Sequence, residues 1–249
     1  MRKIALIAGI LALVTQLYAE KLTVFVAANA RHAMSEIKDE FMKSHPKDEI
    51  ELSFGATGKA YQQLKNGFPY DMFFAANTKH AVQIETDGNA ATKPKVYALG
   101  AVALYALDEK YISGGVDGLK NLSVKHFSIA NPKVAPYGEA AMEILKNSGN
   151  YEKFEKIIVL GDNISQAVSF VDSGAAEVGL VALSLLRQGD GAKGKYIIVD
   201  SALHSPIAQS FVIVKRAEKS ALAKEFAAYV GSAKAKEVFI KYGYQVPKD

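Results

Sequence analysis

The chain of 249 residues contains no cysteine. This absence excludes a disulfide scaffold, a thiol nucleophile, thiolate metal sites and a lipid anchor on cysteine. The fold therefore depends on its core alone. With 49% hydrophobic residues, the chain is long enough to bury one large or two modest domains without cross-links.

A strong excess of charge of one sign is also missing. The chain has 30 basic and 26 acidic residues, and removal of the first 19 residues would take away Arg2 and Lys3 and leave 28 against 26. A nearly neutral protein has no broad basic field to hold nucleic acid or an anionic membrane. We therefore expect neither as a partner.

The longest apolar run, residues 4–14, is short and lies at the very start of the chain, directly after Met1, Arg2 and Lys3. It is too short for a membrane-spanning helix, which needs roughly 20 apolar residues. A basic start, a short apolar middle and a small residue at the cut are typical of a secretory signal peptide. We expect residues 1–19 to be this signal, cleavage to follow Ala19, and the mature protein to reach the periplasm.

After this segment, short β-branched and aromatic runs alternate with helical stretches, which predicts an α/β fold with parallel sheet. The predicted strands are residues 22–26, 49–53, 71–75, 97–107, 126–130, 156–160, 178–182, 196–199 and 207–214. The predicted helices are residues 33–44, 60–66, 78–87, 137–148, 165–173, 221–230 and 233–242. No repeat or linker rich in Pro, Gly or Ser interrupts the pattern, so ordinary strands such as 97–107 and 207–214 would connect any two domains.

Four turns share one feature: a strand ends, small or polar residues follow, and a helix begins. They span residues 27–29, 55–58, 131–138 and 161–165. The first turn of a helix exposes N–H groups without intrahelical partners and the positive end of the helix dipole. One such turn is usually an ordinary helix cap. Several at the carboxyl ends of strands in an open α/β sheet favour a binding site for an anion.

Sequence signatures of catalysis and metal binding are missing. The serines and the five histidines occur in no GxSxG or HExxH frame. The pair Gly58-Lys59 does not complete a P-loop, because Ser53 stands at the first glycine position and Ala60 at the Ser/Thr position. We interpret Lys59 as an exposed first-turn residue and Asp162 as a helix N-terminal acid, and we expect no enzyme activity.

With these residues in view, the chain resembles the ModA family of periplasmic molybdate- and tungstate-binding proteins of ABC importers. The similarity is carried by the segments VFVAANA (24–30), SFGATGK (53–59), NGFPYDMFFAA (66–76), ANPKVAPYG (130–138), NISQA (163–167), VGLVALS (178–184) and YGY (242–244). The resemblance implies a type II periplasmic binding protein, in which two α/β lobes close on a ligand in the cleft between them.

By position, the resemblance implies that Ala28, Asn29 and Thr57 of lobe 1 and Tyr137 and Ile164 of lobe 2 donate hydrogen bonds to the oxyanion. Thr57 would use its hydroxyl and its N–H, and the others chiefly their backbone N–H. Lobe 1 would comprise residues 20–98 and 206–249, and lobe 2 residues 99–205. No cofactor and no cation ligand is implied; the partners are the oxyanion and the membrane permease of an ABC importer, and we expect a monomer.

Two positions depart from the family pattern. Asn29 stands where many relatives have a serine, so that an amide can donate there instead, and Ala182 stands where some relatives have a tyrosine hydroxyl. We assign no ligand role to Tyr242 and Tyr244, which are expected to close the last helix onto the core with Gly243 as its C-cap.

Three alternatives remain open at this stage. The first is a binding protein for sulfate, another oxyanion or a small organic acid. The second is a secreted enzyme on the same two-lobed fold, which would need a general base in the cleft. The third is an adhesin built on a binding-protein scaffold, which would bind no oxyanion tightly.

Overall fold

The computed structural model describes residues 19–187 and 192–247. The predicted signal peptide lies outside the described residues, except for its last residue, Ala19. Within the described ranges, no helix is long and apolar enough to cross a lipid bilayer.

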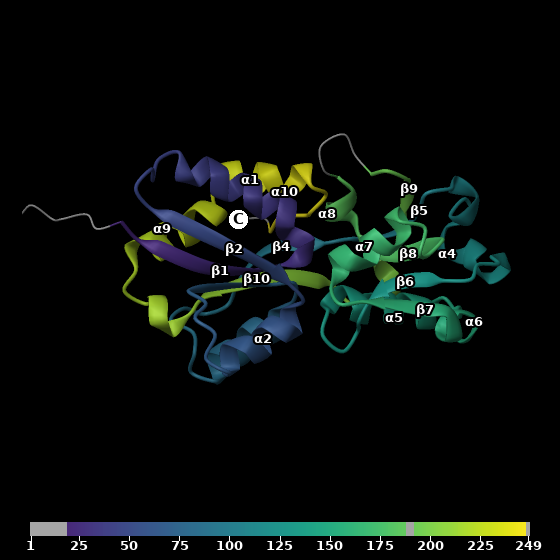
Figure 1. Ribbon diagram of the computed structural model, residues 1–249, viewed down its shortest axis with the longest axis horizontal. Helices are drawn as coiled ribbons and strands as arrows, with labels where there is room; N and C mark the ends of the chain where they lie inside the picture. Colours follow the sequence, from purple (N-terminus) through teal and green to yellow (C-terminus); the bar gives the residue numbers. More distant parts are fainter. Residues whose placement is uncertain (1–18, 188–191, 248–249) are drawn as a thin grey trace, which may run out of the picture.

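Two mixed sheets of five strands form two lobes that lie side by side (Figure 1). The first sheet has the order β2-β1-β3-β10-β4 and the second has the order β7-β6-β8-β5-β9. The strands of the first sheet are β1 (Lys21–Ala27), β2 (Glu49–Gly55), β3 (Met72–Ala75), β4 (Lys95–Gly100) and β10 (Ile207–Ile213). Those of the second are β5 (Val102–Ala106), β6 (Phe127–Ala130), β7 (Ile158–Gly161), β8 (Val178–Ala182) and β9 (Lys195–Ile198).

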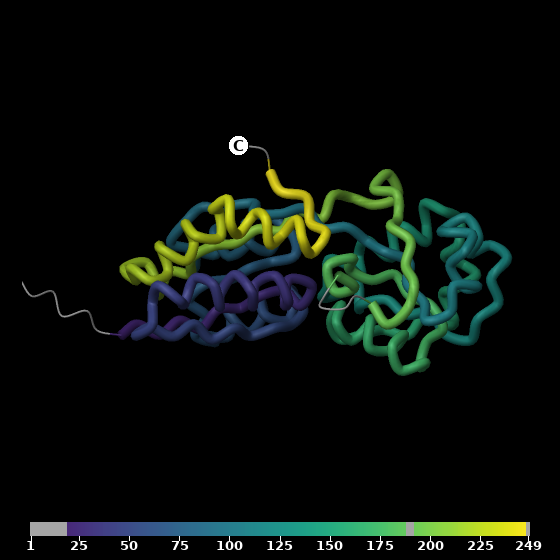
Figure 2. Tube along the Cα trace, turned by 90° about the horizontal axis from the view of Figure 1, so that it is seen from above, coloured from purple at the N-terminus to yellow at the C-terminus, as the bar shows by residue number. Residues whose placement is uncertain are grey.

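The helices follow the strands in the alternation that the sequence predicts. Lobe 1 carries η1 (Ala28–Ala30), α1 (Arg31–Met42), α2 (Thr57–Lys65), α3 (Thr78–Thr86), α9 (Ala221–Val230) and α10 (Ala233–Lys241). Lobe 2 carries α4 (Gly115–Gly118), α5 (Pro136–Asn147), α6 (Tyr151–Phe154), α7 (Ile164–Asp172) and α8 (Leu183–Leu186). The two C-terminal helices return to the first lobe, as Figure 2 shows in yellow.

Alternation along β1 explains how lobe 1 buries both faces of its sheet. Leu22, Val24 and Val26 belong to the core that α1, α9 and α10 cover, whereas Phe25 packs into the core under α2 and α3. Successive strand residues point to opposite faces, so an apolar run without polar interruptions is the signature of a sheet covered on both sides. The core of the second lobe also includes residues of the first, namely Ala27, Ala28, Ala56, Ala76 and Ile207.

The prediction of a parallel sheet holds only for part of each lobe. Strands β1, β2 and β3 run parallel, as do β6, β7 and β8, but β10 and β5 pair antiparallel with their neighbours. The predicted single strand 97–107 is also wrong: β4 ends at Gly100, β5 begins at Val102 in the other sheet, and only Ala101 lies between them. The chain therefore leaves the first sheet and enters the second within one residue.

Candidate functional site

The site begins where two pairs of parallel strands end in register. In lobe 1, Ala27 at the end of β1 pairs with Gly55 at the end of β2. In lobe 2, Ala130 at the end of β6 pairs with Gly161 at the end of β7. Because each strand leads into a helical segment, the four turns singled out in the sequence converge from two lobes on one region.

A small cavity lies between these turns. The cavity has a volume of about 10 Å³, so the two lobes leave little free space between the turns. All five predicted ligand residues line it. The lining consists of Ala27, Ala28, Asn29, Gly55, Ala56, Thr57, Ala76, Ala135, Pro136, Tyr137 and Ile164.

The side chain of Thr57 is held with its proton free for a ligand. Its Oγ1 accepts a hydrogen bond from the N–H of Ala76 at 3.1 Å, and the residue is 1% exposed. A hydroxyl that accepts in this way still has one proton to donate. Thr57 is also the first residue of α2, where the backbone N–H has no intrahelical partner.

The other helix starts leave particular N–H groups unused. In lobe 1, Ala28 and Asn29 open η1, whose first N–H groups have no partner within the helix. In α5, Pro136 has no N–H and occupies the first turn, so Tyr137 supplies the first available N–H. Residues at the starts of these helices therefore line the cavity from both lobes.

The start of α7 shows how a cap selects one donor. The side-chain oxygen of Asn163 accepts from the N–H groups of Ser165 at 2.9 Å and Gln166 at 3.2 Å. Ile164 lies between the cap and these residues, and its N–H is not among the groups that the Asn163 side chain binds. Ile164 lines the cavity, and its N–H is the first-turn group that the Asn163 side chain does not bind.

A buried polar cluster behind Asn29 was not predicted from the sequence. The Asn29 amide nitrogen donates to Gln209 Oε1 at 2.9 Å and to the Tyr244 hydroxyl at 2.7 Å. The Asn29 carbonyl accepts from the hydroxyls of Tyr244 at 3.0 Å and of Ser184 at 2.8 Å. Tyr244 was expected only to close the last helix onto the core, but its hydroxyl contacts a residue that lines the cavity.

Three atoms of this cluster are buried without a partner in the described structure: Asn29 Oδ1, Gln209 Nε2 and the Tyr137 hydroxyl. The last two lie close together, because a Cβ at Gly100 would be 2.1 Å from the Tyr137 hydroxyl and 2.8 Å from Gln209 Nε2. Buried polar groups are almost always hydrogen-bonded. The orientation of the Asn29 and Gln209 side-chain amides therefore determines which of these buried atoms have hydrogen-bond partners.

The charges near the cavity are few. No charged side chain is among the described residues that line it, and the described chain has no group of three or more acidic or histidine residues that could hold a metal ion. The Nε2 of His80 lies near Gly58, at 3.4 Å from where a Cβ would be, but burial lowers the pKa of His80 to about 4, so the ring is neutral at physiological pH. Burial likewise raises the pKa of the Tyr137 hydroxyl, which stays protonated.

Contacts across the cleft show that the lobes are closed. The N–H of Gly58 donates to the carbonyl of Val134 at 2.9 Å, next to the cavity. At the rim, Lys59 Nζ lies 2.8 Å from Asp162 Oδ1. The sequence placed these two as an exposed lysine and a helix N-terminal acid, and the structure adds that they pair with each other across the cleft.

Comparison with known proteins places this architecture among binding proteins. A family model described as bacterial extracellular solute-binding protein matches residues 22–245. The chain is 37% identical to the molybdate-binding protein ModA of Azotobacter vinelandii over 97% of this chain and 95% of that protein. It is 33% identical to the molybdate-binding protein ModA of Rhodobacter capsulatus over 88% and 86% of the two chains.

A solved structure agrees with these sequence similarities. The periplasmic molybdate-binding protein of Azotobacter vinelandii superposes with a TM-score of 0.85 at 30% identity, covering 91% of this chain and 100% of that one. The match covers both lobes, so it includes the region in which the four turns meet.

Proposed function

Because the chain belongs to the bacterial extracellular solute-binding proteins, and within them to the ModA family, we propose that it captures molybdate or tungstate in the periplasm and delivers it to the permease of an ABC importer. The observation that carries this proposal is the uncharged, donor-lined cavity between two closed lobes. Members of this family are transport proteins, and the secreted-enzyme alternative is set aside.

The proposed ligands are the N–H groups of Ala28, Asn29, Thr57, Tyr137 and Ile164 and the hydroxyl of Thr57. Each hydrogen bond to a charged group contributes about 1.5–3 kcal/mol. Six of them, after the entropy cost of binding, are consistent with a dissociation constant of about 1 μM or below, which corresponds to roughly 8 kcal/mol or more. No lysine or arginine is needed at the anion itself.

The orientation of two amides completes the proposed donor set. A half-turn of both the Asn29 and Gln209 amides would let Gln209 Nε2 donate to Asn29 Oδ1. Gln209 Oε1 would then lie beside the Tyr137 hydroxyl and could accept its proton. This arrangement gives partners to all three unpartnered atoms and leaves the Asn29 NH₂ group on the side of the amide that Gln209 and Tyr244 do not occupy. We propose that this NH₂ group is a further donor to the anion.

Selectivity follows from the character of these groups. A site with donors only favours an anion without protons over one whose proton needs an acceptor, which disfavours hydrogen phosphate. The donors cannot separate molybdate from sulfate, because both are fully deprotonated, so cavity size is proposed to do so. The close relatives named above are molybdate-binding proteins, which does not favour the sulfate alternative.

Closure couples binding to transport in this proposal. Binding of the anion to N–H groups of both lobes shifts the equilibrium from open to closed. The closed form is then the one presented to the permease. The expected lobe boundary at 98/99 would divide β4, whose residues Leu99 and Gly100 pair with β10 in the first sheet. We therefore propose that the first crossing between the lobes lies at Ala101 and keep the second at 205/206, with the mature protein acting as a monomer.

The experiment that tests the function is a thermal unfolding series. The midpoint of the mature protein is measured alone and with molybdate, tungstate, sulfate or phosphate, since a ligand that binds the native state raises the midpoint by mass action. A rise with molybdate and tungstate only is the expected result. A larger rise with sulfate would replace the proposed ligand, and no rise with any anion would favour the adhesin alternative.

A further inference from the structure

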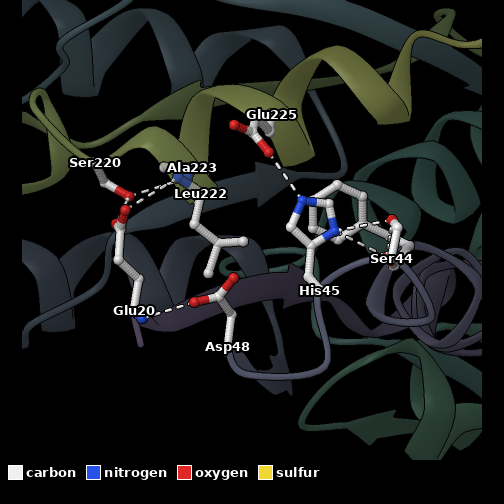
Figure 3. Close-up of polar contacts among 9 residues, drawn as sticks. Glu20, Ser44, His45, Asp48, Ser220, Leu222, Ala223 and Glu225 are labelled. Atoms are coloured by element: carbon white, nitrogen blue, oxygen red, sulfur yellow. Dashed lines mark hydrogen bonds and ion pairs between the residues drawn. The ribbon is translucent and has the colours of Figure 1, made fainter. Parts of the chain in front are cut away.

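Glu20 makes hydrogen bonds through its main-chain N–H, its carbonyl and its carboxylate, and Figure 3 shows those of the N–H and the carboxylate. Its main-chain N–H donates to Asp48 Oδ1 at 2.8 Å, and its carbonyl accepts from the N–H of Glu49 at 2.9 Å. Its carboxylate accepts from the hydroxyl of Ser220 and from the N–H of Leu222 at 3.4 Å, at the start of α9. One residue thus joins the α1–β2 connection to the N-terminus of a C-terminal helix.

The neighbouring residue behaves differently. Ala19 is exposed, whereas the N–H, the carbonyl and the carboxylate of Glu20 are all hydrogen-bonded. The Ala19–Glu20 bond therefore joins an exposed residue to one whose main-chain and side-chain groups are hydrogen-bonded to the fold. The predicted cleavage position is the same bond.

The Asp48 carboxylate, which binds the Glu20 nitrogen, could form an ion pair if that nitrogen carried a positive charge. Other carboxylates nearby already have basic side chains as partners: Glu49 lies 3.0 Å from Lys21 Nζ, and Glu225 lies 2.8 Å from His45 Nε2. The Asp48 carboxylate instead accepts the main-chain N–H of Glu20. A cation at this nitrogen would make that hydrogen bond charge-assisted on both sides.

We propose that a membrane signal peptidase creates this cation by cleaving the Ala19–Glu20 bond, and that the released α-ammonium of Glu20 forms an ion pair with Asp48. Hydrolysis adds one water across the peptide bond. Ala19 leaves with the new carboxylate, and the Glu20 nitrogen keeps the hydrogens of an amine and takes up a proton. Cleavage thereby places a positive charge on the donor of a hydrogen bond whose acceptor is already a carboxylate, so that the bond becomes an ion pair.

The inference rests on the export assumed in the proposed function, but not on the anion. The Glu20 cluster lies at the start of β1 and the anion cavity beyond its end. Variants at the cluster are therefore expected to keep the affinity for molybdate. If the protein binds no anion, the proposed ion pair between Glu20 and Asp48 is not contradicted. If the ion pair does not form, the proposed anion binding is not contradicted.

The test compares two forms of the protein that differ only at the N-terminus. One begins at Glu20, and the other keeps Met-Ala before Glu20, so that the nitrogen remains an amide. The mature form is expected to unfold about 2–4 °C higher, the shift that about 1 kcal/mol produces in a domain of this size. Asp48→Asn keeps an oxygen for the neutral N–H but removes the charge, so in this variant the two forms should unfold together.

Glu49→Gln serves as the matched control, because it removes a neighbouring acid that does not bind the Glu20 nitrogen. The difference between the two forms should persist in this variant. Equal midpoints of the two forms in the wild-type background would overturn the proposal, and so would an undiminished difference in Asp48→Asn. Mass spectrometry of the exported protein supplies a second check: a mature chain that begins at any residue other than Glu20 contradicts it.

Discussion

At the scale of single residues, the hydroxyl of Thr57 has two roles. It accepts the buried N–H of Ala76 and offers its proton to the cavity. Thr57→Val is therefore expected to weaken molybdate binding by about 10-fold or more, the loss of one hydrogen bond to a charged group. It should also lower stability, because the Ala76 N–H loses its acceptor.

Titration calorimetry and thermal unfolding separate these two effects. Thr57→Ser is the matched control, since it keeps the hydroxyl and should retain most of the affinity and stability. Molybdate affinity in Thr57→Val equal to that of the wild type would remove this hydroxyl from the site.

The Asn29 amide provides a second prediction at this scale. With its NH₂ group toward the anion, Asn29→Ala should weaken molybdate binding by about 10-fold, and Asn29→Asp should weaken it by more than 100-fold because a carboxylate repels the dianion at short range. The measurement is again calorimetry, with circular dichroism to verify folding. Unchanged or tighter binding by Asn29→Ala would indicate that the oxygen faces the cavity.

The residues that line the cavity could be predicted from the sequence, but the partners that hold Asn29 could not. Helix starts after strands are local patterns that indicated the four turns, and the resemblance to the ModA family supplied the individual residues. The structure places them around one cavity: Ala28, Asn29, Thr57, Tyr137 and Ile164. The partners of Asn29 are 180 positions away at Gln209 and 215 at Tyr244. Contacts over such separations depend on how the last strand and the C-terminal segment return to lobe 1, which no local spacing encodes.

At the scale of secondary-structure elements, the passage from β4 to β5 positions α5. Gly100 ends β4, and the space that a Cβ would need there is occupied by the Tyr137 hydroxyl at 2.1 Å and Gln209 Nε2 at 2.8 Å. The missing side chain at Gly100 thus lets α5 of one lobe approach a strand of the other. The role of Gly100 was not predicted, because the apolar run continues from β4 into β5 and residues 97–107 were therefore interpreted as one strand.

Gly100→Ala is expected to destabilise the protein by about 1–3 kcal/mol through overpacking. It should also weaken molybdate binding, because Tyr137 carries one of the proposed donor N–H groups. Unfolding and calorimetric titration measure the two effects. Tyr137→Phe removes the nearest clashing atom and should partly restore stability to the double variant.

Gly118→Ala is the control for the substitution itself, since a Cβ at Gly118 meets no atom within 4 Å. It should leave both properties unchanged. If Gly100→Ala is as harmless as this control, the close approach of Tyr137 does not constrain the position.

At the scale of the whole molecule, closure of the two lobes is the event that function requires. Lys59 and Asp162 meet only when the lobes come together, and both side chains are largely exposed, at 47% and 72%. Exposed ion pairs contribute little and are screened by salt. The pair should therefore adjust the stability of the closed form without determining it.

Lys59→Gln and Asp162→Asn are each expected to weaken molybdate binding by up to about fivefold at low salt, with most of the change in the dissociation rate. The double variant should resemble the single ones, and high salt should remove the difference from the wild type. Lys65→Gln, at the other end of α2, is the control. Additive losses in the double variant would mean that the two side chains act separately.

The most direct measurement of the central claim is calorimetric titration of the mature protein with molybdate, repeated in the presence of excess sulfate or phosphate. One molybdate per chain with a dissociation constant of about 1 μM or below, little affected by either competitor, is the result predicted from an uncharged cavity that offers only donors. Absence of binding heat together with an unchanged unfolding midpoint, or displacement of molybdate by equimolar sulfate, would contradict it.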